Sequence, residues 1–293
     1  AVGVGLLVAL MVVLALSSIV IGGLMSVLVR QQRFYRGTAD LIETRSQIRQ
    51  AAGIIPSDLR GVSTIGGDIL EITDTSMTFR ATIGQAVACV LPPNLAANTI
   101  VVPPLVLANG NTLASFSMTP QAGDTVFVYD DGLLDAASDD AWRAYGITAA
   151  PGTSNLDCLA LTGGDVSSRY SFALDGALSA TIQVGAPMRF VRRTQYILYK
   201  AADGSWYLGY CAPACGGAPQ PIAGPFLPAG GGTAGVSFSY QDAAGAATAL
   251  PAAVVQISIV VRGQTQGVVD MGGYKNTYVG DSLRFSVAIR NRQ

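Results

Sequence analysis

The first 29 residues carry no charged side chain, and the first charge in the chain is Arg30. A helix of about 20 apolar residues crosses the hydrocarbon core of a bilayer, so this segment is long enough to span one. The alternatives are a secretory signal peptide, whose apolar stretch is shorter and follows a basic region, and a core helix, which needs a larger protein around it. We predict insertion into a membrane, or into an equivalent apolar environment made of partner helices.

The middle of this apolar segment is its weakest part as a helix. Ser17 and Ser18 are followed by Gly22 and Gly23, and each glycine costs about 1 kcal/mol relative to alanine in a helix interior. Lipid would hold these residues helical, because unpaired backbone groups are not tolerated there. In a packed protein environment we expect residues 17–23 to unwind locally.

Residues 30–60 continue the helix with a polar surface and one apolar stripe. Gly53 and Pro56 mark where we expect it to kink or end, and Arg45 interrupts the stripe. A coiled coil is the alternative, but we favour a helix of about 50 residues, roughly 80 Å long, that docks on one globular domain while its apolar half projects from it. The stripe consists of Phe34, Thr38, Leu41, Ile48, Ala52, Ile55 and Leu59.

Beyond residue 65 the apolar residues alternate with polar ones, which is the pattern of half-buried strands. We predict an α+β fold in which the long N-terminal helix packs on a mainly antiparallel β-sheet head formed by residues 61–293. Within the head we interpret residues 90–185 as a variable insertion, with a helical turn at residues 139–142. Turns at residues 73–75 and 201–204 join neighbouring strands. The expected strands cover residues 68–72, 76–82, 124–129, 189–200, 205–211, 235–240, 255–262 and 283–290.

The composition removes several classes of function. The net charge is −1, so we expect no nucleic-acid partner. The chain has no histidine, which excludes imidazole bases and histidine-containing zinc sites in their usual form. Neither Lys200 nor Lys275 lies in a phosphate-binding or Ser-Lys motif, and the glycines at Gly3 and Gly5 follow no strand. We expect neither an enzyme nor a bound cofactor.

The four cysteines are Cys89, Cys158, Cys211 and Cys215. An even number favours two disulfides on an exported protein, with Cys211 and Cys215 closing a local loop and Cys89 left for Cys158. A four-thiolate metal site needs two close pairs, and only one pair is close. Free thiols are the remaining alternative.

The orientation of the apolar segment in the membrane has two conflicting signals. Disulfides place the residues after it on the exported side, whereas the positive-inside rule, applied to Arg30, Arg33 and Arg36, places them in the cytoplasm.

Two further clusters of residues each have a structural and a functional interpretation. One is acidic and offers oxygen ligands for calcium, but it lacks the alternating oxygen ligands and the closing glutamate of an EF-hand loop. A pair of catalytic carboxylates in a hydrolase is the other functional interpretation, but nothing nearby would shift the pKa values of two carboxylates apart. We favour solvated loop carboxylates. The other is aromatic and falls on two adjacent strands, where cross-strand packing is favoured over a platform for sugars or bases. The acidic residues are Asp130, Asp131, Asp135, Asp139 and Asp140, and the aromatic ones are Tyr196, Tyr199, Trp206, Tyr207 and Tyr210.

The N-terminal segment GLLVALMVVLALSSIVIGGLMSVLVRQQRFYR resembles the mature N-terminal helix of type IV pilins and type II secretion pseudopilins, most closely that of the large PilW-type minor pilins. Three later segments, GVSFSYQDAAG, AVVQISIVVRGQ and SLRFSVAIRNR, resemble the closing strands of the same group in the same order. The resemblance is strong over residues 1–82 and 188–293 and weak between them.

The resemblance implies a prepilin whose basic leader is removed, leaving Ala1 as a residue that is commonly N-methylated. It implies a helix that first anchors the subunit in the inner membrane and then packs among copies of itself or other pilins in an extracellular filament, where residues 17–23 match a stretch that melts. The head is displayed for adhesion or surface interaction. Gly5 departs from the family, which usually has Glu there. A family subunit that lacks this Glu sits at the filament tip, so a minor or tip subunit is one alternative, and a membrane-anchored binding module is another.

Overall fold

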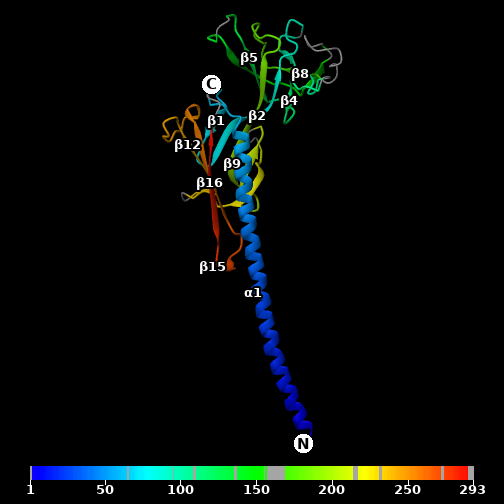
Figure 1. The fold of residues 1–293 in the computed structure, drawn as a ribbon, viewed down its shortest axis with the longest axis vertical. Helices are drawn as coiled ribbons and strands as arrows, with labels where there is room; N and C mark the ends of the chain where they lie inside the picture. Colours follow the sequence, from blue (N-terminus) through cyan, green and yellow to red (C-terminus); the bar gives the residue numbers. More distant parts are fainter. Residues whose placement is uncertain are drawn as a thin grey trace.

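The computed structural model describes residues 2–64, 66–94, 96–107, 110–134, 137–154, 156, 169–213, 217–230, 233–271 and 274–289. One helix, α1 (Val2–Leu59), extends from one end of the molecule, and the strands gather around and beyond its second half (Figure 1). Its 58 residues give a length of about 87 Å at 1.5 Å per residue. The α+β architecture with a mainly antiparallel head is confirmed.

The head contains sixteen strands among the described residues, and every pair of strands in that part of the chain is antiparallel. A short 3-10 helix, η1 (Pro251–Ala253), precedes β13. The strands are β1 (Ile69–Ile72), β2 (Ser76–Val87), β3 (Thr99–Val101), β4 (Ser115–Phe116), β5 (Thr125–Asp130), β6 (Ala141–Gly146), β7 (Gly152–Ser154), β8 (Arg169–Ala173), β9 (Pro187–Lys200), β10 (Trp206–Cys211), β11 (Gln220–Phe226), β12 (Val236–Gln241), β13 (Gln256–Gln264), β14 (Val269–Met271), β15 (Tyr274–Thr277) and β16 (Gly280–Ala288).

The sequence predicted a kink or an end at Gly53 or Pro56, but helix α1 does not end at either residue and continues to Leu59. A proline inside a helix removes one hydrogen bond and costs about 3 kcal/mol. Ile55 and Leu59, on either side of Pro56, are fully buried, and burying each side chain contributes roughly 1.5–3 kcal/mol. Packing of the last turn therefore offsets the cost of the proline.

The apolar stripe of the docked half begins later than predicted. Ile48, Ile55 and Leu59 are buried as expected, whereas Phe34 is 48% exposed because it lies below the head. Arg45 is not part of the stripe: it is exposed, and its Nε lies 2.9 Å from Asp281 Oδ2 on β16. The stripe on the structure consists of Thr44, Ile48, Ala51, Ile55 and Leu59.

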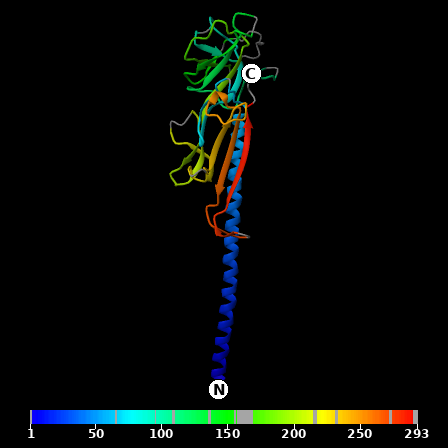
Figure 2. The same cartoon turned by 90° about the vertical axis from the view of Figure 1, so that its left-hand side faces the viewer.

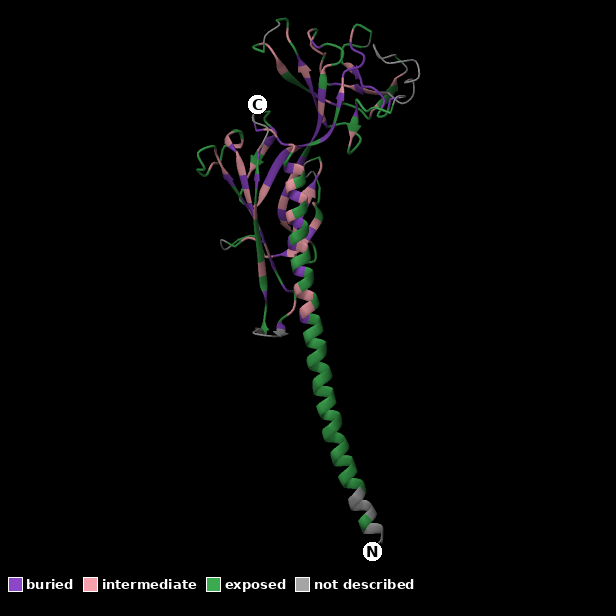
Figure 3. Cartoon of the chain, viewed as in Figure 1, coloured by how far each residue is buried: buried purple, intermediate pink, exposed green. Residues whose placement is uncertain are grey.

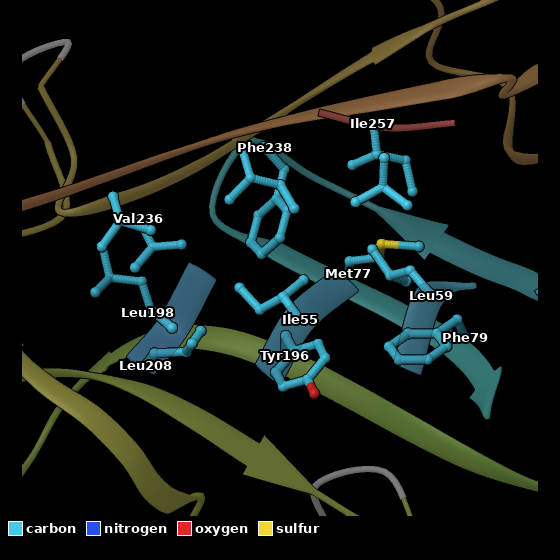
Figure 4. Close-up of a cluster of buried hydrophobic side chains, with 14 of the residues drawn as sticks. Ile55, Leu59, Met77, Phe79, Tyr196, Leu198, Leu208, Val236, Phe238 and Ile257 are labelled. Atoms are coloured by element: carbon cyan, nitrogen blue, oxygen red, sulfur yellow. The ribbon is translucent and has the colours of Figure 1, made fainter. Parts of the chain in front are cut away.

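The second half of α1 lies between two sheets, and together they form the proximal lobe. One sheet has the order β1-β2-β9-β10-β11, and the other has the order β12-β13-β16. Figure 4 shows Ile55 of α1 between Phe238 of β12 and Tyr196 of β9, with Leu59 one turn further along the helix, within a cluster of buried side chains from both sheets. The helix is thus the centre of the core. The predicted hairpins β1–β2 and β9–β10 are confirmed.

A second core defines the distal lobe, at the end of the molecule opposite the N-terminus (Figures 1 and 2). Strands β3–β8 from residues 90–185 build it on the far halves of β2 and β9, which run through both lobes. The helical turn predicted at residues 139–142 is wrong, because β6 pairs with β5 there. Trp142 faces Tyr129 across the two strands, and such cross-strand aromatic pairs stabilise a hairpin rather than one turn of helix.

Two buried ion pairs lie where the lobes meet. The Asp68 carboxylate, on the loop after α1, is fully buried and accepts two hydrogen bonds of 2.8 Å from Arg189 of β9. Asp124, just before β5, accepts two hydrogen bonds of 2.7 Å from Arg192 of β9. Both pairs are bidentate, the geometry in which arginine and carboxylate interact most strongly. They fix β9 to the segments that enter each lobe.

Candidate functional site

The first half of α1, residues 2–36, stands clear of the head, and we call it the stalk. Figure 3 shows residues 10–36 of the stalk as exposed, and the most apolar stretch has a mean hydropathy of 2.5 with none of it buried. This is the single helix among the described residues that is long and apolar enough to cross a membrane. Before Arg30, its exposed large hydrophobic side chains are Leu10, Met11, Val12, Val13, Leu14, Leu16, Ile19, Val20, Ile21, Leu24, Met25, Val27, Leu28 and Val29.

The exposed stalk is unfavourable in water. Each of these fourteen side chains is between 44% and 70% exposed, and full burial of such a side chain contributes roughly 1.5–3 kcal/mol. Transferring the stalk to apolar surroundings therefore releases on the order of 20 kcal/mol. Lipid tails and other apolar helices both supply such surroundings.

Basic and aromatic residues lie where the stalk meets the head. Arg30, Arg33 and Arg36 are exposed and three residues apart, which places them on one side of the helix. We call them the basic collar. Phe34 is 48% exposed and Tyr35 is 70% exposed at the same level. Arginines and aromatic rings that follow an apolar helix are typical of the boundary between a membrane and water.

Hydrogen bonds fasten the docked half of the helix to the head. Asp58 Oδ2 accepts a bond of 2.7 Å from the buried Tyr196 hydroxyl, and burial together with this bond raises the pKa of Tyr196. Gln50 donates to the Ile222 carbonyl at 2.9 Å, and Asp40 accepts from the amide of Gly267 at 3.2 Å. These bonds therefore fix the docked half of α1 to the head, whereas residues 10–36 make no such contact with the described residues of the head and are exposed.

At two glycines the strands of the head approach helix α1 closely. A side chain at Gly37 would lie 3.1 Å from the Val269 Cγ1 atom of β14, and one at Gly263 of β13 would lie 2.7 Å from the Thr44 Cγ2 atom. These two glycines let β13 and β14 pack directly on the helix just above the basic collar. The lower end of the head is thus seated on α1 next to the stalk.

The stalk residues that the sequence singled out lie in an unbroken helix. Gly5, Gly22 and Gly23 each have nothing within 4 Å of an added Cβ atom, so no contact within the chain requires glycine there. The Ser18 hydroxyl donates to the Ala15 carbonyl at 2.8 Å. Melting of residues 17–23 stays a prediction for the assembled state. Ala1 lies outside the described residues.

Cys89 and Cys211 are buried, and both are disulfide-bonded. They are not bonded to each other: Cys211 lies opposite Gln195, and Val87, two residues before Cys89, lies opposite Pro187. Gln195 and Pro187 are about 26 Å apart along β9, whereas bonded cysteines have Cα atoms within about 7 Å. Cys158 and Cys215 lie outside the described residues, so the pairing Cys211–Cys215 and Cys89–Cys158 stays a prediction.

The expectation of solvated loop carboxylates is wrong for Asp130, which is fully buried at the end of β5. Protein donors occupy most of the acidic cluster. Burial opposes ionisation of Asp130, but hydrogen bonds, including one from Arg143, outweigh it and hold the pKa of Asp130 at about 2. Asp139 accepts from the amides of residues 133 and 134 at 2.8 and 2.9 Å, and Asp140 accepts from Tyr129 at 2.6 Å. Asp131 is exposed, and Asp135 lies outside the described residues. In the part of the chain that the structure describes, no three acidic or cysteine side chains gather closely enough to hold a metal ion.

The aromatic cluster on β9 and β10 forms the cross-strand packing that the sequence favoured. Tyr196 and Tyr210 have ring centroids 5.7 Å apart, and Tyr199 and Tyr207 have centroids 6.4 Å apart. The sequence did not indicate a further aromatic pair in the distal lobe, Tyr129 with Trp142, which depends on the pairing of β5 with β6. It also did not indicate the ion pairs at the lobe junction, because their partners lie far apart in the chain.

Comparison of the chain with models of known families, with curated proteins and with solved structures found no match.

Proposed function

We propose that this protein is a structural subunit of an extracellular filament of the type IV pilus kind. In this proposal the stalk anchors the subunit in the inner membrane before assembly and packs among the stalks of other subunits afterwards. The head then remains on the filament surface, where it is available for adhesion. The observation that carries the proposal is the division of one continuous helix into a half held by the head and an apolar half that is exposed at residues 10–36.

The energetics of the stalk support transfer between two environments. A helix that is apolar on every face is stabilised about equally by lipid tails and by a bundle of similar helices. Transfer from one to the other therefore need not expose its apolar surface to water. A stalk used only as an anchor needs about 20 apolar residues. The uncharged segment is longer than that, with 29 residues before Arg30.

The basic collar supports the location proposed for the state before assembly. With Arg30 at the level of the lipid phosphates, the apolar residues lie in the hydrocarbon and Phe34 and Tyr35 lie in the interfacial zone. The head then begins immediately outside the bilayer, because Gly37 already packs against Val269. No part of the docked half of α1 would enter the membrane.

A second candidate function is that of a minor or tip subunit, and Gly5 favours it. The resemblance places a glutamate at this position, where its carboxylate meets the N-terminal amine of the adjoining subunit. The structure leaves room for a side chain at Gly5, so packing within the chain does not explain the glycine. A subunit without this carboxylate lacks the ion pair with the N-terminal amine of an adjoining subunit. Such a subunit suits the end of a filament, where one neighbouring subunit is absent.

Electron microscopy of filaments sheared from the cells that make the protein tests these candidates together. Antibodies against the distal lobe would label the whole filament if the protein is its structural subunit, and only one end if it is a tip subunit. Label confined to the membrane fraction would contradict the proposal and favour a membrane-anchored binding module. Val20→Glu places a charge in the stalk and should abolish incorporation, whereas Ser46→Glu, on the exposed side of the docked half, should not.

A further inference from the structure

The distal lobe carries a groove of about 460 Å³ on the outer face of its main sheet. Its floor is formed by β2 and β9, which contribute Gln85, Val87 and Pro187, among others. Residues 112–115 form one wall, and Trp142 of β6 forms part of the lining as well. The volume lies within the range of small-ligand sites, about 300–1,000 Å³, and the groove lies far from the stalk.

Trp142 is the most informative residue in the lining. It is 52% exposed, although a tryptophan is normally buried for most of its area. Its ring packs edge-on against the Tyr129 ring with centroids 5.5 Å apart, and the Tyr129 hydroxyl is held by Asp140 at 2.6 Å. The indole is therefore fixed in place by its neighbours while about half of its surface stays open to a ligand.

Most of the polar groups of the lining are uncharged. Thr82, Gln85, Thr112 and Ser115 offer hydroxyl and amide groups that both donate and accept hydrogen bonds. Among the residues that the structure describes, Arg189 is the one charged residue that lines the groove. Its guanidinium is engaged by the buried Asp68 carboxylate through two bonds of 2.8 Å and lies over the Phe127 ring. The groove therefore presents little net charge to a ligand.

We propose that this groove binds a neutral saccharide. A sugar ring has an apolar face of C–H groups that packs on an indole, and a rim of hydroxyl groups that pair with amides and hydroxyls like those in the lining. The chemistry of the lining thus matches both surfaces of a sugar. The proposal supplies a ligand class for the adhesive head and relies on the proposed filament only for its biological setting.

Other ligand classes fit the lining less well. An anion such as a phosphate ester needs an unpaired cation, and Arg189 is already paired. A wholly apolar ligand would bury Gln85 and the hydroxyl groups without hydrogen-bond partners, which costs about 1–3 kcal/mol for each. An extended peptide adds to a free sheet edge, but the strands of the groove floor have none among the described residues: β2 lies between β4 and β9, and β9 lies between β2 and β5.

Intrinsic fluorescence provides the test, because the chain has two tryptophans, Trp142 and Trp206. The full chain carrying Trp206→Phe, dispersed in detergent, reports on Trp142 alone. Titration with maltotriose, with the trisaccharide of N-acetylglucosamine and with the trisaccharide of galactose should give a saturable change in emission and protection from acrylamide quenching for at least one of them. A hyaluronan tetrasaccharide is the acidic comparison.

Variants separate the groove from the rest of the surface. Trp142→Ala and Gln85→Ala, followed by calorimetry in the otherwise unchanged chain, should each weaken binding about tenfold or more. Tyr278→Ala removes an aromatic ring of similar exposure in the proximal lobe and should leave the affinity unchanged. Because Gln85 is exposed, its variant tests the groove even if the tryptophan variant folds poorly.

Three results would overturn the proposal. These are no saturable binding of any neutral trisaccharide, equal binding by the wild-type chain and the Gln85→Ala variant, and a preference for the hyaluronan fragment. None of them depends on polymerisation, because the chain is dispersed in detergent throughout. Failure of this proposal would leave the filament proposal standing, and loss of the filament proposal would leave sugar binding measurable.

Discussion

Arg189 of β9 donates two hydrogen bonds to the fully buried carboxylate of Asp68, and Asp68 Oδ2 also accepts the backbone amide of Ser63 at 2.8 Å. Asp68 lies between the end of α1 and β1, while Arg189 lies on a strand that runs through both lobes and lines the groove. One carboxylate thus links the helix end, the strand shared by the lobes and the proposed ligand site. Its removal should affect the whole head.

Asp68→Ala should destabilise the head by about 3 kcal/mol, because it leaves a partly buried guanidinium without its partner. Chemical denaturation of the detergent-dispersed chain measures this free energy of unfolding. The matched control is Glu71→Gln, which removes an exposed pair with Arg193 at 3.2 Å and should change stability by less than about 1 kcal/mol. Equal effects of the two changes would contradict the role assigned to Asp68.

Replacement of Gly22 and Gly23 by alanine should stabilise the helix and impair assembly. An added Cβ atom meets nothing within 4 Å at either position, and each change favours the helix by about 1 kcal/mol. If residues 17–23 must unwind in the filament, the double variant should yield fewer filaments at equal expression. Gly53→Ala, where the added Cβ atom also meets nothing, is the control in the docked half. Normal filament yield from the double variant would show that melting is not required.

The distal lobe should lose stability in acid through Asp130. Its pKa is lowered to about 2 in the folded chain from an ordinary value of about 3.9. This carboxylate therefore contributes stability that is fully present above about pH 4 and is lost as the pH falls toward about 2. Thermal unfolding of the wild-type chain and of Asp130→Asn across this range measures the contribution. The variant should be less stable at pH 7, and its stability should fall less steeply between pH 4 and pH 2; parallel curves would be inconsistent with the assignment.

The basic collar should direct the dispersed protein toward anionic lipid. Each arginine near an anionic surface contributes about 1 kcal/mol, so substitution of Arg30, Arg33 and Arg36 by glutamine should remove most of the preference. The measurement is equilibrium exchange between phosphatidylcholine vesicles and vesicles that also contain phosphatidylglycerol, at low and at high salt. Arg49→Gln, exposed on the docked half, serves as the control. A preference that persists in the triple variant would argue against the collar.

The sequence predicted the helix and the strands of the proximal lobe well because their signals are local. An uncharged run defines the stalk, and two-residue periodicity defines strands such as β13 and β16. At Pro56 it indicated a kink or an end, but the helix continues to Leu59, because burial of Ile55 and Leu59 offsets the local helix-breaking preference of proline. It failed at β6, where Trp142 is held in a strand by pairing with Tyr129. Such effects of tertiary structure are not visible in a single segment.

The candidate sites also differ in whether their signal in the sequence is local. The stalk was evident from hydropathy, and its exposure in the structure agrees with that pattern. The groove could not be predicted, because Gln85, Ser115 and Trp142 come from three separate segments that meet only after β2, β4, β5, β6 and β9 pair. The Asp68–Arg189 pair joins residues 121 positions apart, and nothing near either residue indicates the other.

Photo-crosslinking from position 20 of the stalk, in the cells that make the protein, tests the central claim most directly. The filament account predicts that the sheared surface fraction contains products in which this position is joined to the apolar helix of another subunit. The same crosslinker at position 46, on the exposed side of the docked half, should not join two stalks. Lipid adducts alone, confined to the membrane fraction, would contradict the account.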